Sequence, residues 1–599
     1  MDRPETLTAL FFDAVDRYSS KEAAVRYKEG DEWKGITHQE FARSVHQAAI
    51  GLMELGMKPG DRVAILSENR PEWAMSDFAC LTARCADVPI YPTLPAPQVA
   101  YLLQDSGAKA VFVENAAQYD KIKAIRGEIP ETANVIVYDA EEGMEGPGLM
   151  SFQELLQRGS AAQDKYPNYR SDALSVGKDD LATLIYTSGT TGPPKGVMLT
   201  HYNFCSNVNA ALEVLFIGPD DSCLSLLPLS HSFERMAGHY VMFHRGTTIN
   251  YAESIEQVAA NLGEIKPTVV LSVPRLFEKI YARVLENAMA GSALKRRIFF
   301  WARRTAEAWA DLDLAKKPIP ATIEFKKKIA DKLVFSKLQA RTGGRIRFFV
   351  SGGAPLNPDI AKFFYAAGIK IVEGYGLTET SPVIAANPLE AIHIGTVGPP
   401  IPGVEVKIAE DGEILSRGPH IMKGYYNKPE ATKEAIDPDG WFHTGDIGEF
   451  DDDGYVKITD RKKDLIVTAG GKKVAPQPIE NMIKTNQFVL NAVMVGDKRK
   501  YPALLVVPDV DALRKWAADR NLAVDDVTAF LAQPDVFSKL EREVMGSLRD
   551  LASFEMPKKI GLIEEDFSIE RGELTPTMKV KRRVVEERYG DKIEALYAE

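Results

Sequence analysis

The chain has 599 residues, of which 45% are hydrophobic and 26% are charged, so its composition is neither disordered nor fibrous. Its net charge of −11 argues against a nucleic-acid partner bound through overall basicity. Four cysteines without zinc-like spacing, and no apolar stretch of about 18 residues, argue against a metal module and a membrane-spanning helix. The first residues show no leader pattern, and we therefore expect a cytoplasmic globular protein.

Strand and helix patterns alternate in the N-terminal part. Residues 62–66 form a short apolar run typical of a strand, and Pro71 suits the first turn of the helix that follows. Residues 88–91 and 110–113 predict two more strands, separated by a helix that ends at Gly107. This alternation predicts a parallel α/β sheet.

The same alternation returns at residues 345–372. Residues 346–350 and 369–372 predict strands on either side of a helix with Asn357 as its N-cap and Gly368 just past its end. Ligands of such sheets bind beyond the carboxyl ends of the strands.

From about Thr396, short strand-like runs alternate with Gly, Pro and Asp, which predicts a small antiparallel β unit. A further segment from about residue 461 has strand patterns at 489–495 and 503–507. The predicted fold class is α/β, with a large N-terminal domain of parallel α/β subdomains plus the β unit, then a smaller α+β C-terminal domain.

The strongest motif follows the apolar strand predicted at residues 181–186. Its glycines, hydroxyls and single amine suit phosphate oxygens, although its residue order is not that of a Walker A loop. The candidate residues are Thr187, Ser188, Gly189, Thr190, Thr191, Gly192 and Lys195. Taken alone, the run could equally be an ordinary turn.

A second motif, residues 373–379, comes directly after the strand predicted at 369–372. Its glycines would let a planar ring approach the backbone, and its aromatic ring could stack there. Its threonine could bond a phosphate and its final carboxylate could hold Mg²⁺. The residues are Glu373, Gly374, Tyr375, Gly376, Thr378 and Glu379. Tyr375 could also be an ordinary half-buried aromatic.

Three weaker motifs follow. Asp446 ends a turn-like run, where a carboxylate can accept both hydroxyls of a ribose. The charged run that begins at Asp460 lies where the composition changes, which suits a hinge, although a charge run is usually a solvated face. Lys579 lies in a basic run near the C-terminus, which alone would mean little.

In this order, the five motifs resemble those of the AMP-forming adenylating superfamily, and the long basic insert resembles bacterial long-chain fatty acyl-CoA synthetases. The resemblance implies that a fatty carboxylate attacks the α-phosphate of ATP and that coenzyme A then displaces AMP, with Mg²⁺ as cofactor. A carboxylate is ionised at neutral pH, so the first step needs no general base.

The resemblance also implies residue roles. Residues 187–195 would hold pyrophosphate, and Thr187 with Glu379 would place Mg²⁺. Lys579 would bridge the carboxylate and the α-phosphate, with Lys581 as its neighbouring competitor. The remaining nucleotide-binding residues would be Gly353, Glu373, Gly374, Tyr375 and Gly376 near the adenine, Thr378 at the α-phosphate, and Asp446 with Arg461 at the ribose.

By the same resemblance, residues 1–459 form the large domain and residues 460–599 a mobile domain that turns about Asp460. The turn would bring Gly470 and Gly471 to the coenzyme A side. His231 matches the acyl-pocket motif. Some long-chain relatives carry a tryptophan gate beyond this histidine; residues 232–235 stand here instead, so that gate is not carried over.

The basic insert is a separate feature. Residues 295–347 hold 15 Lys/Arg and 5 Asp/Glu, a net charge of +10 that leaves −21 for the rest of the chain. Its first helix, predicted at 294–310, carries Phe299, Trp301 and Trp309 among arginines and lysines. The segment 294–347 could lie on the inner face of a membrane, or its aromatics could pack on the core beneath a solvated helix.

Two other functions remain open at this point. The enzyme could transfer its acyl group to an acyl carrier protein, or act on a short-chain or aryl acid. A non-catalytic lipid-binding scaffold is disfavoured, because it would be expected to lack Thr187, Glu379, Asp446 or Lys579, and all four are present. A homodimer stays open, and no nucleic-acid partner is expected.

Overall fold

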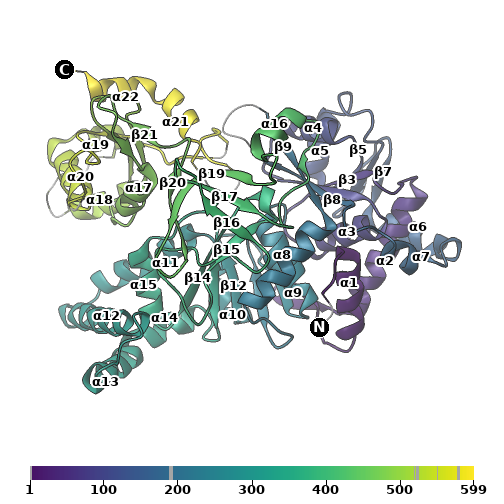
Figure 1. Ribbon diagram of the computed structural model, residues 1–599, viewed down its shortest axis with the longest axis horizontal. Helices are drawn as coiled ribbons and strands as arrows, with labels where there is room; N and C mark the ends of the chain where they lie inside the picture. The colour runs from purple at the N-terminus through teal and green to yellow at the C-terminus, as the bar shows by residue number, and fades with distance from the viewer. Residues whose placement is uncertain are drawn as a thin grey trace.

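The computed structural model describes residues 3–187, 193–518, 520, 522, 525–549, 551–568, 570–575 and 580–598. The predicted residues Ser188, Gly189, Thr190, Thr191, Gly192 and Lys579 lie outside this part of the chain. Figure 1 shows a broad body built from two sheets and their helices, with the C-terminal segment gathered at one end.

The first large sheet contains the predicted N-terminal alternation. β3 (Arg62–Leu66) pairs in parallel with β4 (Ala86–Ile90) and with β5 (Ala108–Val113), and the connecting helices are α3 (Pro71–Thr82) and α4 (Ala96–Ser106). Gly107 ends α4 in a left-handed conformation, as predicted. The strand order is β18-β9-β8-β4-β3-β5-β6-β7. Its other strands are β6 (Asn134–Val137), β7 (Leu149–Ser151), β8 (Leu181–Thr187), β9 (Lys195–Thr200) and β18 (Gly424–Tyr425).

The second large sheet contains the predicted alternation near residue 350. β13 (Phe348–Ser351) and β14 (Lys370–Gly376) are parallel neighbours that flank α15 (Pro358–Ala366), and Asn357 caps this helix as predicted. The order is β15-β14-β13-β12-β10-β11-β1-β2. Its other strands are β1 (Val25–Glu29), β2 (Glu32–Ile36), β10 (Ser222–Ser225), β11 (Thr248–Tyr251), β12 (Val269–Ser272) and β15 (Val383–Ala386).

One boundary in this sheet was predicted wrongly. β14 continues through residues 373–376, so the second motif begins within the strand and not after it. The reason is that β15 pairs antiparallel with this end of β14, opposite Gly374, Tyr375 and Gly376. The start of the motif therefore lies in the strand next to the edge of the sheet, with its backbone held by the edge strand β15.

Helices pack between and around the two sheets. Phe11, Phe41, Phe78 and Phe243 meet in the main core, with the rings of Phe11 and Phe78 4.7 Å apart. The helices of this region are α1 (Leu7–Arg17), α2 (His38–Glu54), α5 (Ala116–Ala124), α6 (Phe152–Ala162), η1 (Gln163–Lys165), α7 (Tyr169–Leu174), α8 (His201–Val214), the π-helix η2 (Glu234–Tyr240), α9 (Val241–His244), α10 (Val258–Ile265) and α11 (Pro274–Met289).

The predicted antiparallel β unit is confirmed. It consists of β16 (Glu405–Ile408), β17 (Glu413–Arg417), β19 (Phe442–Phe450) and β20 (Val456–Arg461), paired in that order, and α16 (Pro429–Ala435) precedes β19. The register sets Asp446 of β19 opposite Arg461 of β20. Its own apolar cluster includes Tyr375 from β14, so the unit packs directly on the second motif.

The C-terminal segment is α+β, as predicted, and has its own core. β23 (Val489–Val495) pairs with β24 (Ala503–Pro508), which pairs with β25 (Ile560–Leu562), and two apolar clusters draw only on residues 466–597. Arg275 of α11 donates to the Leu490 carbonyl, linking this segment to the larger body. The remaining elements here are β21 (Ile466–Val467), β22 (Lys473–Val474), α17 (Pro476–Lys484), α18 (Val510–Ala518), α19 (Val527–Leu531), α20 (Pro534–Gly546), α21 (Arg582–Arg588) and α22 (Gly590–Tyr597).

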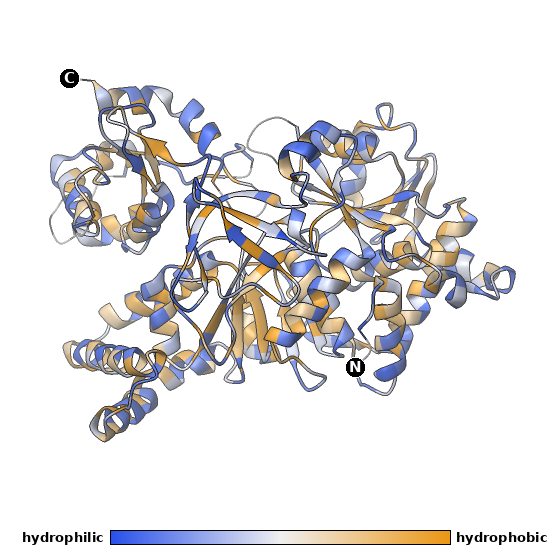
Figure 2. Cartoon of the chain, in the orientation of Figure 1, coloured by the Kyte–Doolittle hydropathy of each residue, from blue (hydrophilic) through white to orange (hydrophobic). Residues whose placement is uncertain are grey.

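The basic insert forms a helical hairpin that projects from the body, where apolar and charged residues lie side by side (Figures 1 and 2). It comprises α12 (Ala293–Leu314), α13 (Ala321–Ala330), the π-helix η3 (Asp331–Phe335) and α14 (Ser336–Arg341). Phe299 is only 7% exposed, and Trp301 and Trp309 are half-buried against the cluster around α15. The aromatics of α12 therefore pack on the core, and the membrane contact of the insert stays a prediction. Within the described residues, no helix has the length and apolarity to cross a bilayer.

Candidate active site

The first motif spans the connection of a β-hairpin. Thr187 ends β8 and Lys195 begins β9, and the antiparallel register makes them a direct pair. The hydroxyl of Tyr186 donates to Asp105 at 2.7 Å, and that of Tyr101 donates to the Pro194 carbonyl at 3.0 Å. Both bonds run to α4, so this helix anchors the two strands that carry Thr187 and Lys195.

Lys195 and Glu379 both contact Tyr425, the first at its ring and the second at its hydroxyl. The Tyr425 hydroxyl donates to Glu379 Oε1 at 2.8 Å, and Lys195 Nζ lies 4.8 Å from the centre of the Tyr425 ring. β18 places this ring, because Tyr425 pairs with Val197 of β9. The backbone N–H of Met422 also donates to the Glu379 carbonyl. One tyrosine thus joins the first two motifs, which lie far apart in the sequence.

Glu379 is a buried carboxylate with positive charge nearby. Burial raises its pKa, while the Tyr425 hydrogen bond and the charges of Lys195 and Arg461 act in the opposite direction. Among the described residues there is no group of three or more histidine, cysteine or acidic side chains that could hold a metal by itself. A single buried carboxylate such as Glu379 is a protein ligand that Mg²⁺ commonly takes, with substrate phosphates and water completing its shell.

A second polar cluster joins three predicted nucleotide-binding residues. The Tyr375 hydroxyl donates to Asp446 Oδ2 at 2.7 Å, and Arg461 Nε lies 3.5 Å from Asp446 Oδ1. The Tyr375 ring is buried in the apolar cluster of the β unit, and burial raises the pKa of its hydroxyl. The cluster therefore holds an oriented carboxylate at the seam between β14 and the β unit.

The glycines of the second motif differ in their surroundings. A Cβ at Gly376 would lie 1.7 Å from the Pro382 carbonyl oxygen, so the chain's own backbone requires glycine there. A Cβ at Gly374 would meet its nearest atom at 3.7 Å, an ordinary contact. Gly353 has φ +82°, a left-handed conformation that favours glycine. The space beside Gly374 therefore fits the predicted approach of a planar ring, whereas the space beside Gly376 is filled by the chain's own backbone.

Glu373 bonds to the turn that follows β13. Its Oε2 accepts a hydrogen bond from the Leu356 N–H at 3.3 Å, beside the turn that contains Gly353. Burial raises the pKa of this carboxyl to about 8. Glu373 therefore braces the turn after β13, which lies next to the predicted adenine region.

The acyl-pocket motif reaches the second motif through hydroxyls. Ser232 Oγ lies 3.3 Å from Thr378 Oγ1. His231 Nδ1 accepts from the Phe233 N–H at 3.1 Å, and the Phe233 ring packs against Gly352, where a Cβ would come within 3.0 Å of it. The segment that follows β10 thus borders both Thr378 and the turn at residues 352–353.

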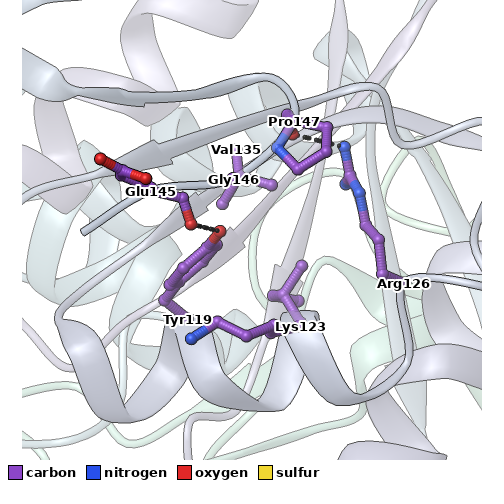
Figure 3. A pocket seen from close by; sticks show the side chains of 8 residues that line it. Tyr119, Lys123, Arg126, Val135, Glu145, Gly146 and Pro147 are labelled. Carbon is purple, nitrogen blue, oxygen red and sulfur yellow. Dashed lines mark hydrogen bonds between the residues drawn. The ribbon is translucent and has the colours of Figure 1, made fainter. Parts of the chain in front are cut away.

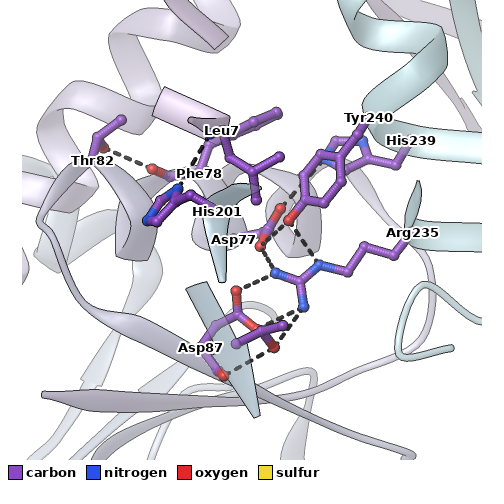
Figure 4. Close-up of polar contacts among 10 residues, drawn as sticks. Leu7, Asp77, Phe78, Thr82, Asp87, His201, Arg235, His239 and Tyr240 are labelled. Carbon is purple, nitrogen blue, oxygen red and sulfur yellow. Dashed lines mark hydrogen bonds and ion pairs between the residues drawn. The ribbon is translucent and has the colours of Figure 1, made fainter. Parts of the chain in front are cut away.

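Behind this segment, Arg235 forms a fully buried ion cluster (Figure 4). Its guanidinium contacts Asp77 and Asp87, and donates to the hydroxyls of Thr183 and Tyr240 at 2.9 Å each. Burial alone would lower the pKa of Arg235, but the two carboxylates outweigh it and raise that pKa well above its usual value. Because Thr183 belongs to β8, the cluster ties η2 to the strand that ends at Thr187.

The predicted hinge residue Asp460 is the chain neighbour of Arg461, and the predicted coenzyme A residues lie further along the chain, in the C-terminal segment. Asp460 is buried in β20, where burial raises its pKa to about 7 against the opposing charge of Arg582. Gly470 and Gly471 occupy an exposed turn between β21 and β22, and Gly471 has φ +74°. The adjacent Ala469 N–H donates to the Arg499 carbonyl, within the C-terminal segment itself.

A hollow of about 240 Å³ lies at the opposite end of the first sheet, near α5 and β6 (Figure 3). Tyr119 and Arg126 line it, and both donate hydrogen bonds to backbone carbonyls at its rim. It contains none of the predicted site residues.

Tyr425, Ser232 and the Arg235 cluster were not predicted as site residues. Tyr425 lies in a Gly-Tyr-Tyr run without a recognised motif, and its role depends on the pairing of β18 with β9. The only sequence signal for Arg235 was a charged residue beside the acyl-pocket motif, and its two carboxylate partners, Asp77 and Asp87, lie more than 140 residues away. Tertiary contacts, not spacing, create these interactions.

Two α/β sheets, a small β unit and a separate C-terminal core, with amine, hydroxyl and carboxylate groups at their junction, define a nucleotide-binding α/β protein. A family model described as AMP-binding enzyme matches residues 11–426, and one described as AMP-binding enzyme C-terminal domain matches residues 463–599. The chain belongs to the AMP-binding enzyme family.

Curated relatives are similar over nearly the whole chain. The long-chain-fatty-acid–CoA ligase FadD15 of Mycobacterium bovis is 39% identical over 568 residues, which cover 94% of this chain and 92% of that protein. The peroxisomal long chain acyl-CoA synthetase 7 of Arabidopsis thaliana is 33% identical over 631 residues, which cover 100% of this chain and 87% of that protein.

Solved structures share the fold at lower identity. The anthranilate CoA ligase AuaEII, in complex with anthranoyl-AMP, has a TM-score of 0.74 at 19% identity and covers 99% of both chains. The didomain of a carboxylic acid reductase from Segniliparus rugosus, in complex with AMP, has a TM-score of 0.76 at 21% identity and covers 99% of this chain and 82% of that one. At these identities the likeness concerns the fold alone.

Proposed function

We propose that this protein is a long-chain fatty acid–CoA ligase that converts ATP, a fatty acid and coenzyme A into acyl-CoA, AMP and pyrophosphate. The observation that carries the proposal is the convergence of Lys195, Tyr425 and Glu379 beside the Tyr375–Asp446–Arg461 cluster. An amine, a buried carboxylate and a second oriented carboxylate suit a triphosphate, a metal and a ribose. The names of the relatives supply the substrate class.

The chemistry proceeds in two displacements. A fatty carboxylate oxygen attacks the α-phosphorus of ATP, the bond to the β-phosphate oxygen breaks, and acyl-AMP and pyrophosphate form. The coenzyme A sulfur then attacks the acyl carbon, AMP leaves, and the thiol proton passes to solvent. Both steps mainly require anions to be positioned and charge to be stabilised.

Each candidate residue has a role in the first displacement. Thr187 and Lys195, together with Ser188, Gly189, Thr190, Thr191 and Gly192, hold the departing pyrophosphate. Thr378 contacts the α-phosphate, and Lys579 bridges it to the fatty carboxylate. Asp446 accepts the ribose hydroxyls with Arg461 beside it, and the adenine lies against Gly353, Glu373, Gly374, Tyr375 and Gly376.

The donor set fits Mg²⁺, with the Glu379 carboxylate and the Thr187 hydroxyl as its protein ligands. When bound, the ion neutralises part of the phosphate charge that develops during displacement. Tyr425 orients the carboxylate by its hydrogen bond at 2.8 Å. Lys195 contributes a further positive charge next to the same ring.

We further propose that residues 1–459 and 460–599 move as two domains about Asp460. The separate apolar cores before and after this residue support the division, as does the gap between the two family models at residues 427–462. The rotation would carry Gly470 and Gly471 toward the bound coenzyme A. His231 would border the acyl chain of the bound fatty acid. The fatty acid must reach this pocket from the membrane or the cytoplasm. Residues 294–347 are the proposed membrane contact.

A chain-length series tests the proposal. AMP release is measured with acids from acetate to oleate and with benzoate, each with and without coenzyme A. We expect coenzyme A-dependent AMP release that is fastest with palmitate or oleate, because each buried CH₂ contributes about 0.8 kcal/mol. Preference for benzoate or acetate, or turnover only with an acyl carrier protein, would replace the long-chain CoA assignment by one of the two alternatives.

A further inference from the structure

The outer face of the insert carries an apolar stripe on α13 and η3. Phe325, Ile329 and Leu333 are 66%, 36% and 48% exposed. They are four residues apart, so they follow one another along a single face of the helix. Large apolar side chains exposed in a row are unusual on a surface that faces only water.

Lysines border this stripe on both sides. Lys328 and Lys332 each precede a stripe residue by one position, which puts them on the same side of it. Lys326 follows Phe325 and lies on the other side, and all three lysines are exposed. In the described part of the chain none of the three takes part in an ion pair, whereas Lys327 of the same helix pairs with Asp331.

Both acidic residues of this segment, Glu324 and Asp331, already have partners within the protein. Glu324 accepts a hydrogen bond from the Trp309 indole at 3.0 Å, and Asp331 is held by Lys327 at 2.6 Å. Lys327 is itself buried, over the Trp309 ring. Residues 321–341 contain no other acidic residue. Neither carboxylate pairs with Lys326, Lys328 or Lys332 among the described residues, so the charge of these three exposed lysines is not matched by an ion pair.

The hairpin does not need the stripe for its own packing. The inner face of α13 and η3 buries Ala330 and Phe335 in the cluster that also contains Phe299 and Phe363. The packing that stabilises the hairpin is thus on the inner face of the helix, opposite the stripe. Burial of the outer apolar atoms is favourable and remains available for a partner.

We propose that residues 321–341 dock on an anionic phospholipid bilayer, with the stripe Phe325–Ile329–Leu333 in the interface and the lysines at the headgroup phosphates. A convex helix with one apolar row between long cationic side chains matches a lipid surface, into which lysine stems extend while their ammonium groups stay wet. Uncompensated positive charge selects anionic lipid. The inference deepens the proposed membrane contact of residues 294–347 and does not depend on the ligase chemistry.

Vesicle co-sedimentation tests this docking surface. Wild-type protein is mixed with vesicles of phosphatidylcholine alone, or with 30% phosphatidylglycerol, at low and high salt. We expect binding to the anionic vesicles that falls in high salt. The triple variants Phe325→Ser/Ile329→Ser/Leu333→Ser and Lys326→Gln/Lys328→Gln/Lys332→Gln should each bind at least about tenfold more weakly. The first loses the apolar contact with the interface, and the second loses three positive charges near the anionic surface.

A matched variant outside the insert distinguishes binding through this surface from non-specific hydrophobic adsorption. Phe216→Ser removes a 76% exposed ring outside the insert and should bind like wild type. Binding of both triple variants at the wild-type level, or equal binding of wild type to neutral vesicles, would overturn the proposal. So would a stripe variant that only converts a dimer to a monomer, measured by light scattering. Ligase activity on detergent-dispersed palmitate, measured on the same samples, reports on the proposed function separately.

Discussion

Two tyrosine hydroxyls determine how the carboxylates of the site are presented. Tyr425 bonds to Glu379 and Tyr375 bonds to Asp446, at 2.8 and 2.7 Å. Each carboxylate is buried, and one of its oxygens accepts the tyrosine hydrogen bond. The ionised group remains a strong hydrogen-bond acceptor. A buried carboxylate held in this way is oriented before the substrate arrives, which reduces the cost of ordering it on binding.

Removing the Tyr425 hydroxyl should weaken metal-dependent nucleotide binding. In Tyr425→Phe the ring over Lys195 remains, but Glu379 loses its donor and with it a charge-assisted hydrogen bond of about 1.5–3 kcal/mol. We expect the affinity for ATP to fall about tenfold in the presence of Mg²⁺ and to change little without it. Titration calorimetry with and without Mg²⁺ measures the difference.

Two further variants control for the ring and for tyrosine loss in general. Tyr425→Leu also removes the aromatic face beside Lys195, so it should weaken ATP binding even without Mg²⁺. Tyr455→Phe removes a hydroxyl that bonds the Ala391 carbonyl, and should bind ATP like wild type. Equal Mg²⁺-dependent affinities of Tyr425→Phe and wild type would contradict the assigned orientation of Glu379.

At the scale of elements, local patterns were sufficient where a strand and its connecting helix are neighbours in the chain. β3, α3, α4 and α15 begin or end where apolar runs, Pro71, Asn357 and Gly107 predicted. The end of β14 was missed because its partner β15 lies beyond a turn that no periodicity marks. The polar residues of the motifs were predicted by their chemistry, but Tyr425 and Arg235 are site components only through tertiary pairing.

The ion cluster of Arg235 should be a strong determinant of stability. Arg235→Met leaves Asp77 and Asp87 buried without their counter-charge, which typically costs about 3–5 kcal/mol. We expect a clear fall in the midpoint of thermal or urea unfolding. Because Arg235 also holds Thr183 of β8, the loss should loosen the strand that ends at Thr187.

Neutralising the acids tests whether the effect comes from buried charge. Arg235→Met combined with Asp77→Asn and Asp87→Asn should recover part of the lost stability, since no unpaired charge then remains. Arg347→Met removes a partly exposed partner of Asp221 and should have a smaller effect. An Arg235→Met protein as stable as wild type would show that the cluster is dispensable.

At the scale of the whole molecule, the charge is distributed unevenly along the chain. The net −11 combines a basic insert of +10 with −21 elsewhere, so an acidic total is compatible with anionic partners at particular places. The candidate nucleotide-binding residues gather at the junction of the sheets and the β unit, while the basic hairpin projects away from it (Figure 1). The C-terminal core meets the larger body through few polar contacts, such as Arg275 with the Leu490 carbonyl and Glu286 with Lys515.

A two-domain enzyme that uses one lysine in only one half-reaction should separate the two steps when that lysine is lost. In the proposed mechanism, Lys579 would bridge the carboxylate and the α-phosphate during adenylation and would have no role after the domains turn. We expect Lys579→Ala to lose acyl-AMP formation by at least about a hundredfold. It should still form acyl-CoA from supplied acyl-AMP and coenzyme A at close to the wild-type rate. Pyrophosphate release measures the first step, and thioester absorbance the second.

Lys581 is the matched control for this experiment, because it lies two positions away. Its backbone N–H donates to the Glu573 carbonyl at the start of α21, an interaction that does not require its side chain. Lys581→Ala should therefore retain both half-reactions. If Lys581→Ala lost adenylation while Lys579→Ala kept it, the roles of the two lysines would be exchanged. If Lys579→Ala lost both steps equally, the lysine would support the C-terminal domain as a whole, and the proposed alternation about Asp460 would lose its chemical basis.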